Sequence, residues 1–141
     1  MKTTRKESLF RSLDATGNGR IGKHDILEVL SRSGIAVDDI RLQGLRARLD
    51  QLGDETVDAK GLETLLGGTG QLFARAQRGE LVIPGFNRFA EQVEAIFDRV
   101  RTIDDGRVAD YIPQLARVPG ERFAVAMCTI DGQALQLGDV S

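Results

Sequence analysis

Apolar residues in the first part of the chain recur at helical spacing. Between residues 3 and 66 they stand three or four positions apart, in groups divided by stretches rich in glycine and aspartate. This spacing places each group on one helix face that turns toward a shared core. The groups are Leu9 and Leu13; Ile26, Leu27, Val29 and Leu30; Leu42, Leu45 and Leu49; and Leu62, Leu65 and Leu66. The pattern predicts four short helices arranged as a repeat.

The middle of the chain has a different pattern. A glycine-rich break at residues 67–70 precedes a stretch that reads as a helix, then a kink at "IPGF", then a longer amphipathic helix. Pro84 prevents one helix from running straight through. The apolar stripe of the second helix comprises Phe86, Phe89, Val93, Ile96, Phe97 and Val100. We expect this stripe to be core rather than a groove for a partner.

The last part of the chain predicts a β-hairpin. A short helical turn is expected near residues 113–118, followed by the strand-like "FAVAMCTI" and, after Asp131 and Gly132, by "QALQLGD". Asp-Gly between two such runs is typical of a hairpin turn in which both positions have positive φ. We expect Cys128 to be buried in this hairpin. The fold class is therefore mainly α, with a helical bundle, a long amphipathic helix and a C-terminal hairpin.

Composition narrows the class of protein. The chain has 141 residues, 41% apolar and 28% charged, with a net charge of −2 and charges of both signs interspersed. This length suits one domain, or one small domain and part of a second. The charge balance gives no basis for binding nucleic acid or an anionic membrane. A single cysteine and the absence of a signal-like or membrane-spanning stretch predict a cytoplasmic protein.

Residues 14–25, "DATGNGRIGKHD", have the outline of a calcium-binding loop. Gly19 stands where such a loop turns sharply, and Ile21 stands where paired loops form a small β-bridge. The second loop, from Asp50, lacks the ligand pattern but keeps Val57 at the bridge position. The candidate ligands are Asp14, Thr16, Asn18, the carbonyl of Arg20, and Asp25. Two carboxylates are few for calcium, so we expect an EF-hand-like pair without metal; weak calcium binding is the alternative.

Other chemistry is sparse. His24 is the only histidine and has no second zinc ligand at a suitable spacing, so we expect it at the surface. Cys128 has no base nearby in the sequence that would make it a nucleophile. None of the Ser-x-x-Lys, Gly-x-Ser-x-Gly or His-Glu-x-x-His patterns occurs in the chain. The residues alone define no complete active site, and no cofactor is expected.

Three stretches resemble the glutaminase family, the serine-dependent enzymes with a β-lactamase-like fold that hydrolyse L-glutamine to L-glutamate and ammonia. They are "LVIPGFNRF" (81–89), "DGRVADYIPQLARV" (105–118) and "FAVAMCTIDGQALQLGD" (123–139). Some members of the family also carry an EF-hand-like segment before the catalytic domain. The resemblance implies that residues 1–66 are such a region, that residues 67–80 are a linker and helix, and that residues 81–141 begin the catalytic domain.

The resemblance also assigns a role to Tyr111. The tyrosine of the family's "DYIPQLA" motif lines the glutamine pocket, and Tyr111 matches it. The family's Ser-x-x-Lys nucleophile and base lie beyond the "GD" of residues 138–139, so we expect this chain to be an inactive N-terminal part of a glutaminase. The family is commonly homo-oligomeric. The alternative is that the EF-hand-like region is a regulatory or interaction module without catalytic activity.

Overall fold

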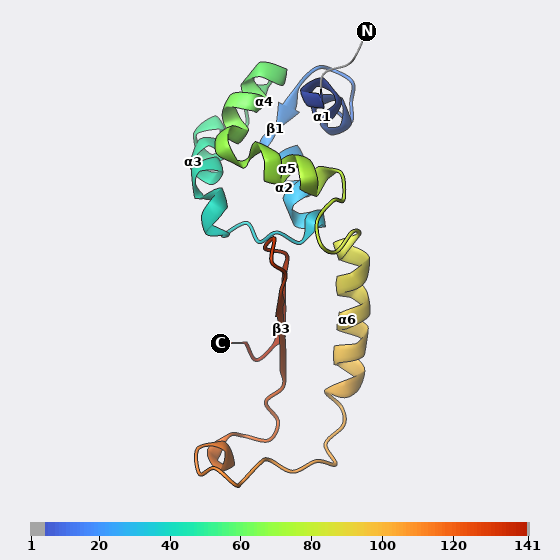
Figure 1. Cartoon of the computed structure of the whole chain (residues 1–141), viewed down its shortest axis with the longest axis vertical. Coiled ribbons are helices and arrows are strands. Elements are labelled where there is room, and N and C mark those ends of the chain that lie inside the picture. The colour runs from blue at the N-terminus through green and yellow to red at the C-terminus, as the bar shows by residue number, and fades with distance from the viewer. Residues whose placement is uncertain (1–4, 141) are drawn as a thin grey trace.

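The computed structural model describes residues 5–140, and it is mainly helical with short antiparallel strands. Helices α1 to α5 form a bundle that we call the helical unit (Figure 1). The bundle elements are α1 (Arg5–Leu13), β1 (Ile21–Gly22), α2 (Lys23–Ser33), η1 (Ile40–Leu42), α3 (Gln43–Leu52), β2 (Thr56–Val57), α4 (Ala59–Leu66), η2 (Gly67–Thr69) and α5 (Gly70–Gln77). The remaining elements are α6 (Phe86–Val100), η3 (Leu115–Arg117), β3 (Ala124–Cys128) and β4 (Ala134–Gly138).

The four predicted helices of the first region are confirmed as α1, α2, α3 and α4. Strands β1 and β2 come from the two loops between these helices and pair antiparallel, with Ile21 opposite Val57 and Gly22 opposite Thr56. Ile21 and Val57 are the two residues that the loop pattern placed at the bridge positions. The pairing fastens the two helix-loop-helix repeats to each other at one end of the bundle.

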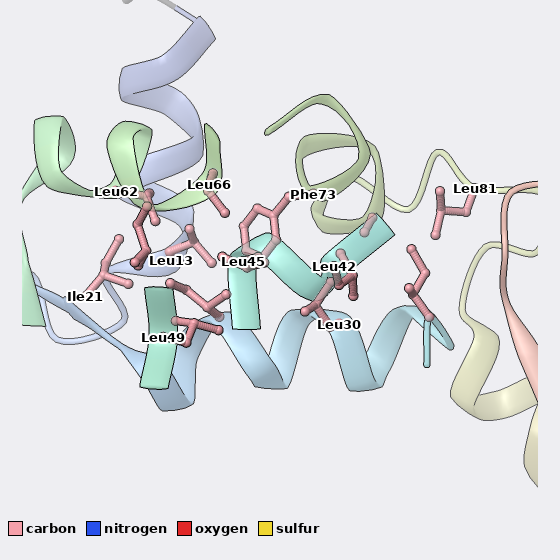
Figure 2. Packing of buried hydrophobic residues seen from close by; sticks show 14 residues of the cluster. Leu13, Ile21, Leu30, Leu42, Leu45, Leu49, Leu62, Leu66, Phe73 and Leu81 are labelled. Atoms are coloured by element: carbon pink, nitrogen blue, oxygen red, sulfur yellow. The ribbon is translucent and has the colours of Figure 1, made fainter. Parts of the chain in front are cut away.

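The helical unit has a hydrophobic core of its own (Figure 2). Leucines from α2, α3 and α4 meet around Phe73 of α5, and Ile21 closes the core at the loop end. The buried residues are Leu13, Ile21, Ile26, Leu30, Ile35, Leu42, Leu45, Leu49, Leu62, Leu65, Leu66, Phe73, Ala76 and Leu81. Because burial of apolar surface is the main stabilising term in folding, this cluster accounts for most of the stability of the unit.

Beyond the helical unit the chain is more open (Figure 1). Helix α6 leads away from the bundle, residues 101–122 turn at the far end, and the β3–β4 hairpin leads back to the bundle. Phe97 of α6 stacks on Phe123 with ring centroids 5.0 Å apart. The stripe of α6 is core only in part: Phe86 and Phe97 are buried, whereas Ile96 and Val100 are exposed. No helix within residues 5–140 has the length and apolar character needed to cross a bilayer.

The hairpin is confirmed, but its turn differs from the expectation. Asp131 does not have a positive φ; only Gly132 does, at +92°. The amide of Gly132 donates to the carbonyl of Thr129 (3.0 Å), so the tight turn spans residues 129–132 and Gly132 lies at its end. A turn followed by a left-handed glycine is the next most common hairpin connection after the two-residue type. Within this turn the carboxylate of Asp131 accepts a hydrogen bond from the hydroxyl of Thr129.

The expectation that Cys128 is buried is wrong: this residue is exposed. Successive side chains of a strand point to opposite faces. In β3 the half-buried residues are Val125 and Met127, while Ala124, Ala126 and Cys128 share the exposed face. The apolar run around Cys128 therefore reflects a strand with only one covered face.

Candidate functional site

Tyr111 lies on irregular backbone between α6 and η3. The helical turn predicted near it is confirmed as η3, which begins after Pro113. The side chain of Tyr111 is 79% exposed and makes no hydrogen bond to any other residue that the structure describes. Its hydroxyl is therefore free to meet a ligand or another part of a larger protein.

The candidate calcium loop is held by its own hydrogen bonds. The carboxylate of Asp14 accepts from the backbone amides of Asn18 (3.1 Å) and Gly19 (2.7 Å) and from the hydroxyl of Thr16 (3.3 Å). The side-chain oxygen of Asn18 accepts from the amide of Arg20 (2.8 Å). The Asp25 carboxylate accepts from the amide of Gly22 (2.8 Å), at the start of α2. Asp14 and Asp25 thus each stabilise local backbone.

Two cations lie on the paired loops. The guanidinium of Arg20 donates to the hydroxyl (2.9 Å) and the carbonyl (2.8 Å) of Thr56, across the β1–β2 pair. Lys23 donates to Asp50 at 2.7 Å, and this hydrogen bond holds the pKa of that carboxyl below its usual value. His24 is exposed, as expected. Within residues 5–140 no group of three or more histidine, cysteine or acidic side chains is placed to hold a metal ion.

A polar contact that the sequence did not predict lies at the hairpin tip, residues 129–133. Gln133 is 0% exposed. Its side-chain nitrogen donates to the carbonyls of Ser33 (2.7 Å) and Ile83 (2.9 Å), and its side-chain oxygen accepts from the amide of Ile83 (2.9 Å). The amide of Ala134 donates to the carbonyl of Gly34 (2.9 Å). One buried side chain thus joins the end of α2 to the segment before α6.

Asp131 makes a second contact at the same tip. It is 8% exposed, and its carboxylate accepts from the amide of Val82 (2.8 Å) and the hydroxyl of Thr129, with Arg75 3.6 Å away. Burial alone would raise the pKa of Asp131. The hydrogen bonds from Thr129 and Val82 and the charge of Arg75 outweigh it and hold the pKa below its usual value. The carboxylate therefore stays ionised in the folded protein at neutral pH.

An ion pair on the helical unit completes the contact. Arg41 pairs with Asp39 at 2.6 Å and also donates to the carbonyl of Asp131 at 2.8 Å. The hydrogen bond from Arg41 holds the pKa of Asp39 below its usual value. We call the residues that receive the hairpin tip the socket: Ser33, Gly34, Arg41, Arg75, Val82 and Ile83.

The larger cavity of the helical unit, about 530 Å³, lies between α1, α4 and α5 and is lined by Leu9, Leu62, Leu66 and Ala74 among others. A smaller one, about 200 Å³, borders the socket at Ser33, Phe86 and Gln133. Tyr111 lines neither cavity. The candidate calcium ligands line neither of these two cavities either.

Comparison with known proteins gives a consistent result. Residues 106–141 match the sequence model of the Glutaminase family. The liver isoform of mitochondrial glutaminase from Rattus norvegicus is 30% identical over 129 residues, covering 88% of this chain and 21% of that protein. Putative glutaminase 2 of Caenorhabditis elegans is 42% identical over 69 residues, which cover 49% of this chain and 11% of that protein. Glutaminase of Aeromonas hydrophila is 45% identical over 53 residues, which cover 37% of this chain and 17% of that protein.

These matches all name one class of enzyme, the glutaminases. On this basis the chain is similar to members of the glutaminase family, and its residues 106–141 match the family's sequence model. The chain spans about a fifth of the length of the rat relative and about a quarter of a second relative from Caenorhabditis elegans.

Proposed function

We propose that this chain is part of a glutaminase that hydrolyses L-glutamine to L-glutamate and ammonia, and that Tyr111 contributes to the wall of its glutamine pocket. The observation that carries the proposal is the match of residues 106–141 to the family model, because this stretch contains Tyr111. The exposure of Tyr111 supports it, since the phenol is not used to stabilise the fold.

The chemistry requires more groups than the 141 residues supply. Hydrolysis of an amide by acyl transfer needs a nucleophile, a base and donors for the developing oxyanion, held together in one site. The sequence contains no Ser-x-x-Lys pattern. The proposed role of the chain is therefore to bind and orient glutamine through Tyr111, with the nucleophile and base contributed by other parts of the enzyme.

An ammonia-release assay tests the proposal in two stages. The 141-residue protein alone is expected to release no ammonia from glutamine. Fused to the part of the Aeromonas hydrophila glutaminase that follows the stretch similar to this chain, it is expected to become active. Tyr111→Phe should then lower kcat/KM by roughly tenfold to a thousandfold, the range for loss of one pocket hydroxyl.

Val108→Ala, a change at another exposed residue of the same segment, is the matched control and should leave the activity within about twofold. Full activity of the Tyr111→Phe fusion would contradict the assignment of Tyr111. Activity of the 141 residues alone would contradict the proposal that the nucleophile and base are contributed by other parts of the enzyme.

We propose as a second candidate that the helical unit is an EF-hand-like regulatory module. The pairing of Ile21 with Val57 favours it, because paired loops are the feature by which such repeats associate. Calorimetric titration with CaCl2 is expected to give no binding tighter than about 100 µM, given two carboxylates in the first loop. Sub-micromolar binding that is lost in Asp14→Asn would favour a calcium-responsive module instead.

The family resemblance supports two further proposals: a β-lactamase-like fold for the complete catalytic domain and homo-oligomerisation of the enzyme. A third proposal, residence in the cytoplasm, rests on the single cysteine, which suits a reducing compartment. Light scattering after gel filtration of an active fusion tests the second. A single mass equal to one protomer across a hundredfold range of concentration would contradict it. Fractionation of cells that express the tagged enzyme tests the third.

A further inference from the structure

We propose that Gln133 fastens the hairpin to the helical unit, so that the helical unit is a structural support of the glutaminase-matching segment. The proposal goes beyond the proposed function and does not depend on hydrolysis of glutamine. It rests on the contacts of the hairpin tip with the socket.

The first argument is that the hairpin tip caps α2. The last carbonyls of a helix have no partners within the helix and carry partial negative charge. Here the carbonyl of Ser33, the last residue of α2, accepts from the side chain of Gln133, and the carbonyl of Gly34 accepts from the amide of Ala134. Ile35 also forms a β-bridge with Gln133. The carbonyls of Ser33 and Gly34 thus take their hydrogen-bond donors from a hairpin about a hundred residues further along the chain.

The second argument is that only an amide side chain fits the position. Gln133 donates to two carbonyls and accepts from the amide of Ile83, so it uses both ends of the same group. A carboxylate would face the carbonyls of Ser33 and Ile83 without a proton to donate. An apolar side chain would leave three backbone groups unpaired, and buried unpaired groups are costly.

The third argument is that the hairpin has few other connections to the rest of the protein. Within residues 101–122 every side chain is exposed except that of Leu115, which is half-buried. The stack of Phe97 on Phe123 secures the far end of the hairpin to α6. The end of the hairpin at the bundle is therefore held by the tip and its socket (Figure 1).

Hydrogen exchange with mass spectrometry on the full 141-residue chain tests the proposal. In Gln133→Ala the amides of residues 124–138 should exchange roughly tenfold to a hundredfold faster than in the unmodified chain. The amides of α3 and α4 should keep their rates, because the core of the helical unit does not include the hairpin. Gln133→Glu should behave like Gln133→Ala, although it preserves the size of the side chain.

Gln136→Ala is the matched control, since Gln136 is an exposed glutamine on the same hairpin and should leave all rates unchanged. Unchanged hairpin exchange in Gln133→Ala, or equal acceleration in Gln136→Ala, would overturn the proposal. Normal exchange in Gln133→Glu would also overturn it, because the donor to Ser33 and Ile83 would then be unnecessary. If Gln133→Ala abolished the helical circular dichroism, the residue would be a part of the core and the proposal would fail.

Discussion

Asp131 illustrates how one carboxylate can serve two structures at once. Its hydrogen bond from Thr129 shapes the turn of the hairpin, and its hydrogen bond from Val82 joins the hairpin to the segment before α6. A buried carboxylate is stable only when such partners satisfy it. Arg75 and Arg41 add positive charge and a donor at the same place.

The lowered pKa of Asp131 predicts a dependence of stability on pH. A carboxyl whose folded pKa lies below its unfolded value, near 3.8, contributes stability that is complete above the unfolded value and lost as pH falls through the folded value. Asp131→Asn should therefore lower the free energy of unfolding at pH 7 by about 1–2 kcal/mol. It should also flatten the fall in stability as the pH drops below about 3.8 and through the lower folded pKa.

Urea unfolding at a series of pH values measures both effects. Asp39, whose pKa is also lowered, should keep part of the acid dependence in the variant. Asp110→Asn, at an exposed aspartate, is the control and should leave the curve unchanged. An Asp131→Asn curve parallel to that of the unmodified chain would contradict the role of ionisation.

The exposure of Tyr111 predicts that the fold does not depend on it. Tyr111→Ala should change the free energy of unfolding of the 141-residue chain by less than about 0.5 kcal/mol, as for other surface substitutions. Thermal unfolding followed by circular dichroism checks this. A large loss of stability would show that the ring packs against the protein in solution. A loss of activity in a Tyr111 variant of the fusion would then reflect the fold as well as the proposed pocket.

Residue patterns differ in what they reveal before a structure is available. The pairing of Ile21 with Val57 could be predicted because each position is fixed within a short loop. The burial of Gln133 could not, because its partners lie 50 and 100 residues away and a polar residue after Asp-Gly reads as surface. Cys128 was misplaced because an apolar run cannot indicate that one face of its strand is uncovered.

At the scale of elements, the junction of α2 and α6 depends on one glycine. Gly34 ends α2 with φ +80°, and a Cβ added there would lie 2.3 Å from the ring of Phe86 at the start of α6. Glycine is needed twice over, for its left-handed backbone and for the close approach of the ring. The two helices can meet at this point only because no side chain separates them.

Gly34→Ala should therefore destabilise the protein by about 3 kcal/mol or more, from backbone strain and displacement of Phe86. Gly79→Ala is the matched control: Gly79 also has a positive φ, +65°, but a Cβ there would meet nothing within 4 Å. It should cost about 1 kcal/mol. If urea unfolding showed the same loss of unfolding free energy for both variants, Phe86 would be able to move aside without destabilising the protein.

The core of the helical unit allows a similar comparison. Leu45 of α3 is fully buried (Figure 2). Ile40 of η1 is largely exposed. Leu45→Ala should lower the free energy of unfolding by about 2–5 kcal/mol, and Ile40→Ala by less than about 1 kcal/mol. Urea unfolding distinguishes the two. The helices themselves were predictable because their apolar spacing is local, but which apolar side chains remain exposed depends on the packing between helices.

At the scale of the whole molecule, buried apolar residues are distributed unevenly. The core cluster lies within residues 13–81, and from α6 onward the buried apolar residues are Phe86 and Phe97 within the described chain. Exposed apolar residues gather in the same later part, including Ile96, Ile103 and Ile112. The periodicity of α6 predicted a helix correctly, but it could not show that part of the apolar stripe, including Ile96 and Val100, is exposed to solvent.

The exposed backbone of residues 101–122 has a consequence for protease sensitivity. Arg101, Arg107, Arg117 and Arg122 are exposed there, and exposed irregular segments are preferred sites of cleavage. Brief trypsin treatment should therefore nick the chain between α6 and β3 before it cuts the helical unit. Because the socket still holds the hairpin tip, the two pieces should elute together from a gel-filtration column and separate only in denaturant. The chain can thus be cut on either side of Tyr111, after Arg107 or Arg117, while the resulting pieces remain parts of one particle.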